Sequence, residues 1–479
     1  MQFAENTPYD VLTEKWDPVL GHEALPSIQD DYRKKVTAVL LENQEQALRS
    51  QYLTETMSSN NLGMPQSFSN TPNVAGYDPV LISLVRRSMP NLMAYDICGV
   101  QPMTAPTGLI FAMRSQYQVK GQAESSYANS VEAMFQEPQP SFGGSGWTLG
   151  STFAASRGLS AAWNYTDGVK PGTVQDIRGI LTNYGEGIGN NPLGVCAAQG
   201  PGLLYQTNPT YANWNQMAFS IDRVAVQART RAMSSNYTVE LAQDLKAVHG
   251  LDAEAELANL LSTEILAEIN REIVKTIYFV AKTGSQQRDL NAGGEYDLDI
   301  DSDGRWSAER FRGLSFQIER ECNYIAKETR RGRGNFIICD SDTASALAMS
   351  GFMSLSPAIA PQLNVDDTQS TFAGVINGKI RVYIDPYSPA GYNFFVAGYK
   401  GESPYDAGLF YCPYVPLQMV RAVDPNTFQP RIGFKTRYGV VANPYVLNSN
   451  SVPDGEALTT GLNQYYRFTA VKNLHGNTL

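Results

Sequence analysis

Three aspartates at alternate positions come closest in this chain to a spacing with a known chemistry. They are Asp299, Asp301 and Asp303. Together with Gly304 they resemble the first half of a calcium loop, in which oxygen ligands alternate and a glycine makes the sharp turn. The closing bidentate glutamate is missing, because Arg310 stands at its position and Glu309 lies one residue early. We therefore interpret 297–304 as an exposed acidic turn, with a weak calcium site as the alternative, and we expect no cofactor.

No other group of residues has the spacing of a catalytic site. The histidines His22, His249 and His475 are not at metal-ligand spacing, and no G-x-S-x-G elbow supports a Ser-His-Asp hydrolase. The segment 374–380 is one residue short of a phosphate loop and lacks its Ser/Thr. Asn377-Gly378 suits a type I′ hairpin turn better. The sequence therefore predicts a protein that is not an enzyme.

Two basic clusters are the remaining candidates for a binding role. The first is Arg86 with Arg87, and the second is Arg330, Arg331 and Arg333. A solvated helix end explains each cluster, and the second would complement a helix C-terminus. Alternatively, these arginines contact acidic residues of a neighbouring subunit.

The composition indicates a folded protein without a DNA-binding surface. Of the 479 residues, 43% are hydrophobic and 18% charged, and the net charge is −10. DNA-binding surfaces normally carry a basic excess, whereas an acidic chain could line a DNA container without binding its contents. No apolar run of about 18 residues predicts a membrane span, and the N-terminus lacks the features of a secretory signal. The five scattered cysteines suggest reduced, buried thiols.

The elements that would position these residues can be read from hydrophobic periodicity. Residues 1–55 carry ten acidic and five basic side chains, with a helical pattern that starts at Pro26-Ser27 and ends at Leu53-Thr54-Glu55. Residues 56–76 are polar and rich in Asn, Ser, Gly and Pro, which predicts an extended linker. A short helix through Arg86 and Arg87 should stop at Pro90.

The clearest pattern is a pair of helices in the middle of the chain. One runs from Tyr237 to Val248, and Gly250 is expected in the left-handed role at its end. Asp252 should cap a second helix that runs to Gly284, about 45–48 Å long. Its apolar positions recur every three or four residues: Leu257, Leu261, Ile265, Ile269, Ile273, Ile277 and Val280. Such length suggests a spanning strut.

Strands and shorter helices fill the rest of the chain. Strand-like patches in 108–150 predict a long hairpin, and 151–215 suggests a small β-rich insertion. A helix should start at Ser307, with a buried stripe formed by Phe311, Leu314, Ile318, Cys322 and Ile325. A strand at 335–339, a helix capped near Thr343, a half-buried strand at 379–384 and further strands to 446 follow. The fold class is α+β.

Several segments, in order, resemble the major capsid proteins of T-even-type tailed phages. The most specific is 84–103, which reads Leu-Val-Arg-Arg-Ser-Met-Pro-Asn-Leu-Met-Ala-Tyr-Asp-Ile-Cys-Gly-Val-Gln-Pro-Met. The other matching segments are 106–114, 239–250, 268–272, 334–338, 428–430 and 433–439. The resemblance covers most of 78–445 and is weakest at about 120–215.

The resemblance implies the Hong Kong 97 capsid fold and a division of the chain. The expected parts are a scaffold-associated propeptide at 1–55, an N-terminal arm at 56–107, an extended hairpin loop at 108–150, an insertion domain at 151–215, a peripheral domain at 216–335 with its spine helix at 252–283, an axial domain at 336–425, and return strands with a tail at 426–479.

The resemblance also implies function and partners. The chain would form hexameric capsomers of an icosahedral or prolate head that encloses phage DNA without sequence-specific binding. It would be made in the host bacterial cytoplasm and reside in the virion. Vertex and portal proteins, an internal scaffold, decoration proteins and a prohead protease would be its partners. That protease cuts after hydrophobic-x-Glu motifs, so Leu53 and Glu55 mark a cleavage site that leaves Thr56 as the new N-terminus.

Two other classes of function stay open at this point. A cellular nanocompartment shell of the same fold would need a groove for cargo and would not explain a removable N-terminal segment. A soluble enzyme or calcium-dependent binding module would need a site that the residue pattern does not reveal.

Overall fold

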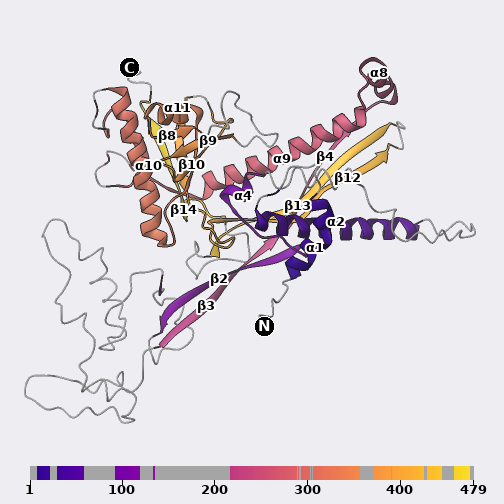
Figure 1. Ribbon diagram of the computed structural model, residues 1–479, viewed down its shortest axis with the longest axis horizontal. Coiled ribbons are helices and arrows are strands. Elements are labelled where there is room, and N and C mark those ends of the chain that lie inside the picture. The colour runs from indigo at the N-terminus through magenta and orange to yellow at the C-terminus, as the bar shows by residue number, and fades with distance from the viewer. Residues whose placement is uncertain are drawn as a thin grey trace, which may run out of the picture. The chain divides into compact units, whose positions relative to one another are not determined.

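The chain is described by a computed structural model. It describes residues 8–21, 28, 30–58, 92–118, 133–134, 216–287, 290, 293–302, 304, 306–355, 371–389, 391–424, 429–444 and 458–474. The chain divides into two compact units. One consists of 1–110 and 223–479, and the other of 111–222. The first unit holds two sheets and the long helices, which is the α+β class expected (Figure 1).

A four-stranded sheet in the first unit has the order β1-β12-β13-β4. Its strands are β1 (Gly99–Val100), β12 (Leu409–Val423), β13 (Pro430–Ala442) and β4 (Arg229–Asn236). β12 and β13 form a long antiparallel pair, and β4 adds antiparallel to β13, whereas the short β1 runs parallel to β12 at the sheet edge.

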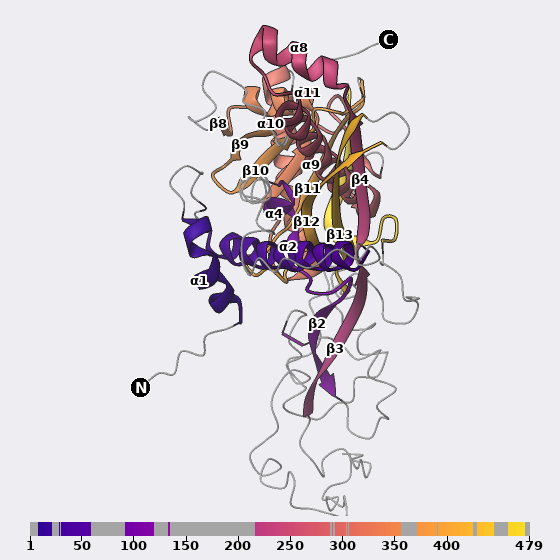
Figure 2. The ribbon, with the colours of Figure 1, turned by 90° about the vertical axis from the view of Figure 1, so that its right-hand side faces the viewer.

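The structure confirms the two central helices that the hydrophobic periodicity predicts. α8 is Val239–His249 and α9 is Ala253–Val280 (Figure 2). Gly250 is left-handed, with φ 68°, and Asp252 caps α9 by accepting a hydrogen bond from the backbone N–H of Glu254 at 3.1 Å. The expected apolar stripe is buried from Leu261 onward. The helix ends at Val280 rather than Gly284, because the chain extends there into β5 (Ala281–Thr283).

A second, eight-stranded sheet has the order β5-β14-β11-β7-β10-β9-β8, with β6 also paired to β14. Its remaining strands are β6 (Glu295–Asp297), β7 (Phe336–Cys339), β8 (Met353–Leu355), β9 (Thr371–Ile376), β10 (Ile380–Ile384), β11 (Asn393–Gly398) and β14 (Asn463–Lys472). The expected turn between β9 and β10 is confirmed, since Asn377 and Gly378 have φ values of 51° and 66°. The phosphate-loop reading is therefore wrong.

Two helices accompany this sheet. α10 (Ser307–Thr329) buries four of the five stripe residues that the sequence predicted, and the fifth, Phe311, packs against the core while partly exposed. α11 (Ser341–Met349) is capped by Asp340 rather than near Thr343. The aspartate precedes the first turn, so its carboxylate reaches the free N–H of Asp342 at 3.3 Å.

The N-terminal segment is helical and packs against the four-stranded sheet. α1 (Pro8–Leu20) lies against α2 (Asp31–Ser58), and α2 contacts β12, while the single turn α4 (Ala94–Ile97) precedes β1. We expected α2 to end at Glu55. It continues to Ser58 because no glycine or proline interrupts the sequence before Gly63.

A two-stranded sheet is formed by β2 (Thr107–Gln118) and β3 (Gln216–Gln227). β2, the first strand of the hairpin expected at 108–150, pairs with a strand that follows residue 215, and of the rest of that hairpin only 133–134 are described, where the Ala133 N–H donates to the Ser115 carbonyl at 2.7 Å. Pairing between distant segments leaves no local signal in the sequence. The insertion expected at 151–215, the linker at 59–76 and the helix through Arg86 and Arg87 lie outside the described residues.

No helix in the described ranges combines the length and the apolar character that crossing a bilayer would require.

Candidate functional site

The acidic turn is closed by the protein's own donors. Asp299 forms an ion pair with the Arg310 guanidinium, whose Nε also donates to the Gly304 carbonyl at 3.1 Å. The Asp301 carboxylate accepts a hydrogen bond from the backbone N–H of Asp297 at 3.0 Å. Arg310, the residue that replaces the closing glutamate, thus brings a positive charge to the turn.

The turn differs from the expectation in its exposure. Leu298 and Ser302 within it are buried, and Asp299 and Asp301 are half-buried, because the turn packs against the start of α10. Asp303 lies outside the described residues. Within the part of the chain that the structure describes, no group of three or more metal-ligating side chains is assembled.

The second basic cluster follows α10. Arg330 is exposed and ends the helix in the left-handed conformation, with φ 53°. Arg333 lies 3.2 Å from the carboxylate of Glu319 on the same helix. The Arg331 carbonyl accepts a hydrogen bond from the Tyr399 hydroxyl. Part of this cluster is therefore bonded within the chain, whereas the Arg330 side chain is exposed to solvent. Arg86 and Arg87, the first basic cluster, lie outside the described residues.

The expected cleavage motif lies in the last turns of α2. Leu53, Glu55 and Thr56 are helical, and α2 ends at Ser58. The sequence predicts a helix end at Glu55, whereas the helix continues for about one further turn, to Ser58. The motif is nevertheless close to a helix terminus, where backbone hydrogen bonds open most readily.

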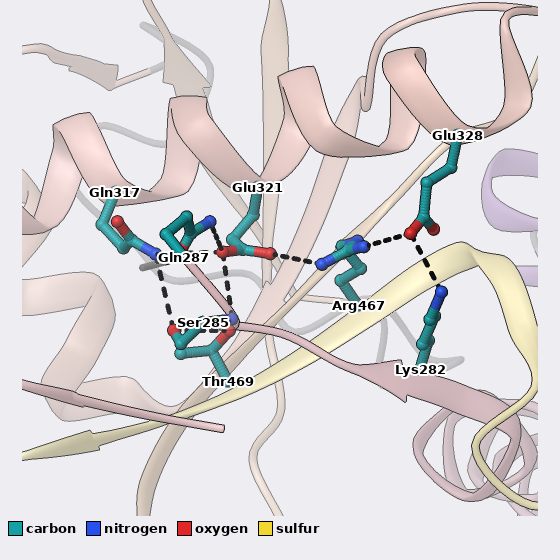
Figure 3. Close-up of polar contacts among 8 residues, drawn as sticks. All are labelled: Lys282, Ser285, Gln287, Gln317, Glu321, Glu328, Arg467 and Thr469. Carbon is teal, nitrogen blue, oxygen red and sulfur yellow. Dashed lines mark hydrogen bonds and ion pairs between the residues drawn. The ribbon is translucent and has the colours of Figure 1, made fainter. Parts of the chain in front are cut away.

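A buried polar cluster, which the sequence analysis missed, lies between α10, β14 and the chain after β5 (Figure 3). Glu321 and Arg467 have side-chain exposures of 0% and 1% and face each other at 3.4 Å. Arg467 also pairs with Glu328 at 2.8 Å, and Glu328 binds Lys282 at 2.9 Å. These contacts join three segments that are far apart in sequence.

Each oxygen of Glu321 has partners. One accepts hydrogen bonds from the Ser285 N–H at 3.0 Å and from the side-chain amides of Gln287 and Gln317, and the other faces Arg467. A buried carboxylate that accepts hydrogen bonds from three donors and faces an arginine is held in place as a structural anchor. Gly284 is required beside it, since a Cβ would stand 2.3 Å from the Thr469 hydroxyl.

A sequence signal for this cluster did exist. Glu321 lies three residues after Ile318 and four before Ile325, so it falls within the buried stripe of α10. Arg467 shares the inward face of β14 with Tyr465 and Thr469, two residues away on either side. A charged residue on each apolar face predicts that the two form a pair.

The thiols provide no nucleophile among the described residues. The four described cysteines are free and buried, as expected: Cys98, Cys322, Cys339 and Cys412. Burial raises the pKa of Cys98, Cys322 and Cys412 to about 12. At neutral pH these thiols are protonated and inert. Cys196 lies outside the described residues.

α9 is anchored at both of its faces by charged contacts. Arg271 forms a two-pronged ion pair with Asp385, at 2.7 and 2.8 Å, and Tyr278 donates to the same carboxylate at 2.9 Å. On the side of the four-stranded sheet, Arg231 binds Glu272 at 2.7 Å. These contacts make the helix a strut between the two sheets.

Comparison with known proteins identifies the family of this chain. Residues 74–471 match the family model of the major capsid protein Gp23. The chain belongs to this family. The Gp23 family is a family of virion shell proteins, so the chain is a structural component of a phage capsid and resides in the virion.

Individual relatives agree with the Gp23 family. The major capsid proteins of Vibrio phage KVP40 and Enterobacteria phage T4 are each 35% identical to 97% of this chain, over 100% and 98% of their own lengths. The capsid vertex protein of phage T4 is 31% identical over 48% of the chain and 53% of its own length. A solved structure from Mycobacterium phage Bobi is 8% identical, covers 85% of this chain and 95% of its own, and has a TM-score of 0.36. The family assignment rests on the sequence comparisons.

Proposed function

We propose that copies of this chain assemble as hexameric capsomers of the Hong Kong 97 type into an icosahedral or prolate head around packaged DNA. The observation that carries this proposal is the apolar surface of β2 and β3. Family membership establishes a capsid shell, and this surface indicates how one copy is held to the next. The nanocompartment and soluble-module alternatives lose their basis, because the Gp23 match covers most of the chain.

Each strand of the β2–β3 ribbon presents an apolar row to solvent. In the unit 111–222 the exposed members are Phe111, Met113, Met217, Phe219 and Ile221, each more than half exposed. They alternate along their strands with other residues, as one face of a strand requires. A two-stranded ribbon is marginally stable in water on its own, and contiguous exposed apolar side chains mark a protein interface. A second copy of the chain is the occupant we propose.

Assembly of a double variant tests this role. Phe219→Ser combined with Ile221→Ser should abolish particles in electron micrographs and sedimentation, while the circular dichroism of the unassembled chain stays unchanged. Arg223→Ser, an exposed polar position on the same strand, is the matched control and should still assemble. Normal particle yield from the double variant would contradict the proposal.

Charge and chemistry support a passive container for DNA. The chain carries a net charge of −10, so its summed field repels phosphate and leaves packed DNA mobile. The four described cysteines are buried, and the described residues assemble no group of three or more metal-ligating side chains. Arg330 is our candidate for an inter-subunit contact with an acidic neighbour, together with Arg86 and Arg87.

The remaining partners follow from the resemblance. We infer that the shell contains vertex and portal proteins, forms around an internal scaffold, and carries decoration proteins. The similarity to the T4 capsid vertex protein supports a vertex built from a related chain. We further infer that a prohead protease cuts after Glu55 during maturation.

A further inference from the structure

The N-terminal segment is bound to the rest of the chain through residues that lie well before Glu55. The Arg33 guanidinium pairs with the Asp96 carboxylate at 2.6 Å and stacks over the Tyr95 ring at 5.4 Å. The Tyr32 hydroxyl donates to the Val100 carbonyl. These contacts join the first turn of α2 to α4 and to β1, the edge strand of the four-stranded sheet (Figure 2).

Asn43 makes the second point of attachment. Its buried side-chain amide donates to the Met103 carbonyl and to the Tyr414 carbonyl, both at 2.8 Å. One side chain thus satisfies backbone acceptors on the chain after β1 and on β12. Asn43 lies twelve residues before Glu55, so none of these bonds depends on an intact peptide bond between Glu55 and Thr56.

Between these two points α2 is buried. Its buried apolar residues are Val36, Ala38, Val39, Leu40 and Leu41. α1 covers α2 in turn, since Trp16 and Leu20 are buried and Lys15 binds Glu42 at 2.6 Å. The segment is therefore a helical hairpin with its own apolar interface, and burial of that interface is the main force that would hold it.

A hollow lies beside α2 at and after Asn43. The next turn of α2 borders a hollow of about 510 Å³, whose wall includes Gln46, Ala47, Gln418, Lys435 and Arg437. Gln46 is exposed. On α2 this open, polar hollow is lined by Asn43, Gln46 and Ala47, which precede the expected cleavage motif.

We propose that the α1–α2 hairpin is a non-covalent ligand of the surface formed by β12 and residues 95–103, and that it stays bound after the chain is cut following Glu55. This inference rests on the cleavage proposed above. The cut removes only the covalent tether, which lowers the local concentration of the hairpin from the millimolar range of a short linker to its bulk value. Release is a separate, later step, and the surface beneath α2 stays covered until it occurs.

An engineered cut in the unassembled full-length chain tests the proposal. A site-specific protease sequence replaces residues 53–58, the chain is cut at micromolar concentration, and size-exclusion chromatography with native mass spectrometry follows the fragment 1–52. We expect the fragment to co-elute with the body. Separate elution at that concentration would overturn the proposal.

Two matched substitutions three residues apart locate the attachment. Asn43→Ala leaves two backbone carbonyls without their donor and should raise the dissociation constant of the fragment about 10- to 100-fold. Gln46→Ala should change it less than about threefold. Equal effects of both substitutions would refute the role of Asn43. Circular dichroism before the cut verifies that each variant folds.

The outcome is independent of the natural protease. If mature virions retained residues 1–55, the proposed maturation would fail while the engineered cut could still show a bound hairpin. If the virions lacked them and the engineered fragment separated at once, only the present inference would fail.

Discussion

Glu321 and Arg467 show how a charged pair is tolerated inside an apolar core. Removing two charges from water costs several kcal/mol for each ion. The loss is offset here because Glu321 accepts three hydrogen bonds and Arg467 contacts two carboxylates and the Tyr324 ring, 4.4 Å from its guanidinium carbon. Such a pair stabilises the fold only as a complete set.

Breaking this pair from one side should therefore be costly. Glu321→Leu leaves Arg467 with one carboxylate fewer and should lower the free energy of unfolding by about 3–5 kcal/mol. The double substitution Glu321→Leu with Arg467→Met removes both charges and should recover part of the loss. Urea denaturation of the unassembled chain measures each value.

A surface carboxylate provides the control for the buried pair. Glu319→Gln on the same helix disrupts the partly exposed pair with Arg333 and should cost less than about 1 kcal/mol. If Glu321→Leu were no worse than Glu319→Gln, the buried pair would not anchor the fold.

The acidic turn at 297–304 is expected to hold no calcium. The Arg310 guanidinium is bonded to Asp299, and backbone N–H groups already donate to the Asp297 and Asp301 carboxylates. A cation would have to displace a charge that the protein supplies itself. Isothermal titration of the unassembled chain with calcium should show no binding at micromolar concentrations. Binding that is lost on Asp301→Ala would show this interpretation to be wrong.

At the scale of elements, the α8–α9 connection depends on one residue. Gly250 is left-handed, and a Cβ there would meet nothing within 4 Å, so only backbone strain opposes a larger residue. Gly250→Ala should destabilise the connection by roughly 1 kcal/mol. Because α8 has no buried residue, the effect should appear as faster amide hydrogen exchange in α8.

Gly433 provides a control that distinguishes backbone strain at Gly250 from the effect of replacing any glycine. At Gly433 a Cβ would meet its nearest atom at 3.6 Å, an ordinary contact, and the backbone is not left-handed. Gly433→Ala should therefore leave hydrogen exchange in α8 unchanged. Equal exchange in α8 for wild type and Gly250→Ala would contradict the proposed strain.

Helices were predictable from the sequence where local chemistry defines them. Apolar spacing placed α9 and α10, and the cap at Asp252 and the glycine at 250 gave their joining ends because both act within one turn. The predicted C-terminal end of α2 was too early, because it was inferred from the cleavage motif rather than from a helix-breaking residue. The pairing of β2 with β3 was missed, because strand pairing between distant segments depends on tertiary contacts.

The candidate sites were only partly predictable from the sequence. The sequence favoured a hairpin turn over a phosphate loop, and the structure confirms the turn at Asn377 and Gly378. The Glu321–Arg467 pair was visible as two charges on buried faces, yet only their meeting in space gives them a role. The docking of α2 through Asn43 left no comparable signal, because its partners are backbone carbonyls.

For the whole molecule, charge and proteolysis are connected. Residues 1–55 carry ten acidic and five basic side chains, so their removal changes the formal charge from −10 to −5. A less acidic chain has a weaker long-range field, and the proposed loss of the segment would free interior volume. Both changes favour filling of a closed shell by a polyanion.

Among the hydrophobic-x-Glu motifs, packing in the structure favours the one at Glu55. Leu40 and Leu41 are buried and Glu42 is paired with Lys15, so a protease cannot engage that segment without dislodging α1. The motif at 266–268 lies inside α9, with its first two residues buried. The motif at 53–55 lies within the last turns of α2, where unwinding breaks few hydrogen bonds.

We therefore predict that the mature chain begins at Thr56. N-terminal mass spectrometry of mature virions measures this directly. Glu55→Gln should block the cut, because the protease family requires glutamate there, and should leave heads with an intact N-terminus. Glu14→Gln alters another motif of this pattern, at 12–14, and should leave the start at Thr56. A mature chain beginning at Met1 or Gln2 would instead make residues 1–55 a permanent arm, held in place by the contacts of Tyr32 and Asn43.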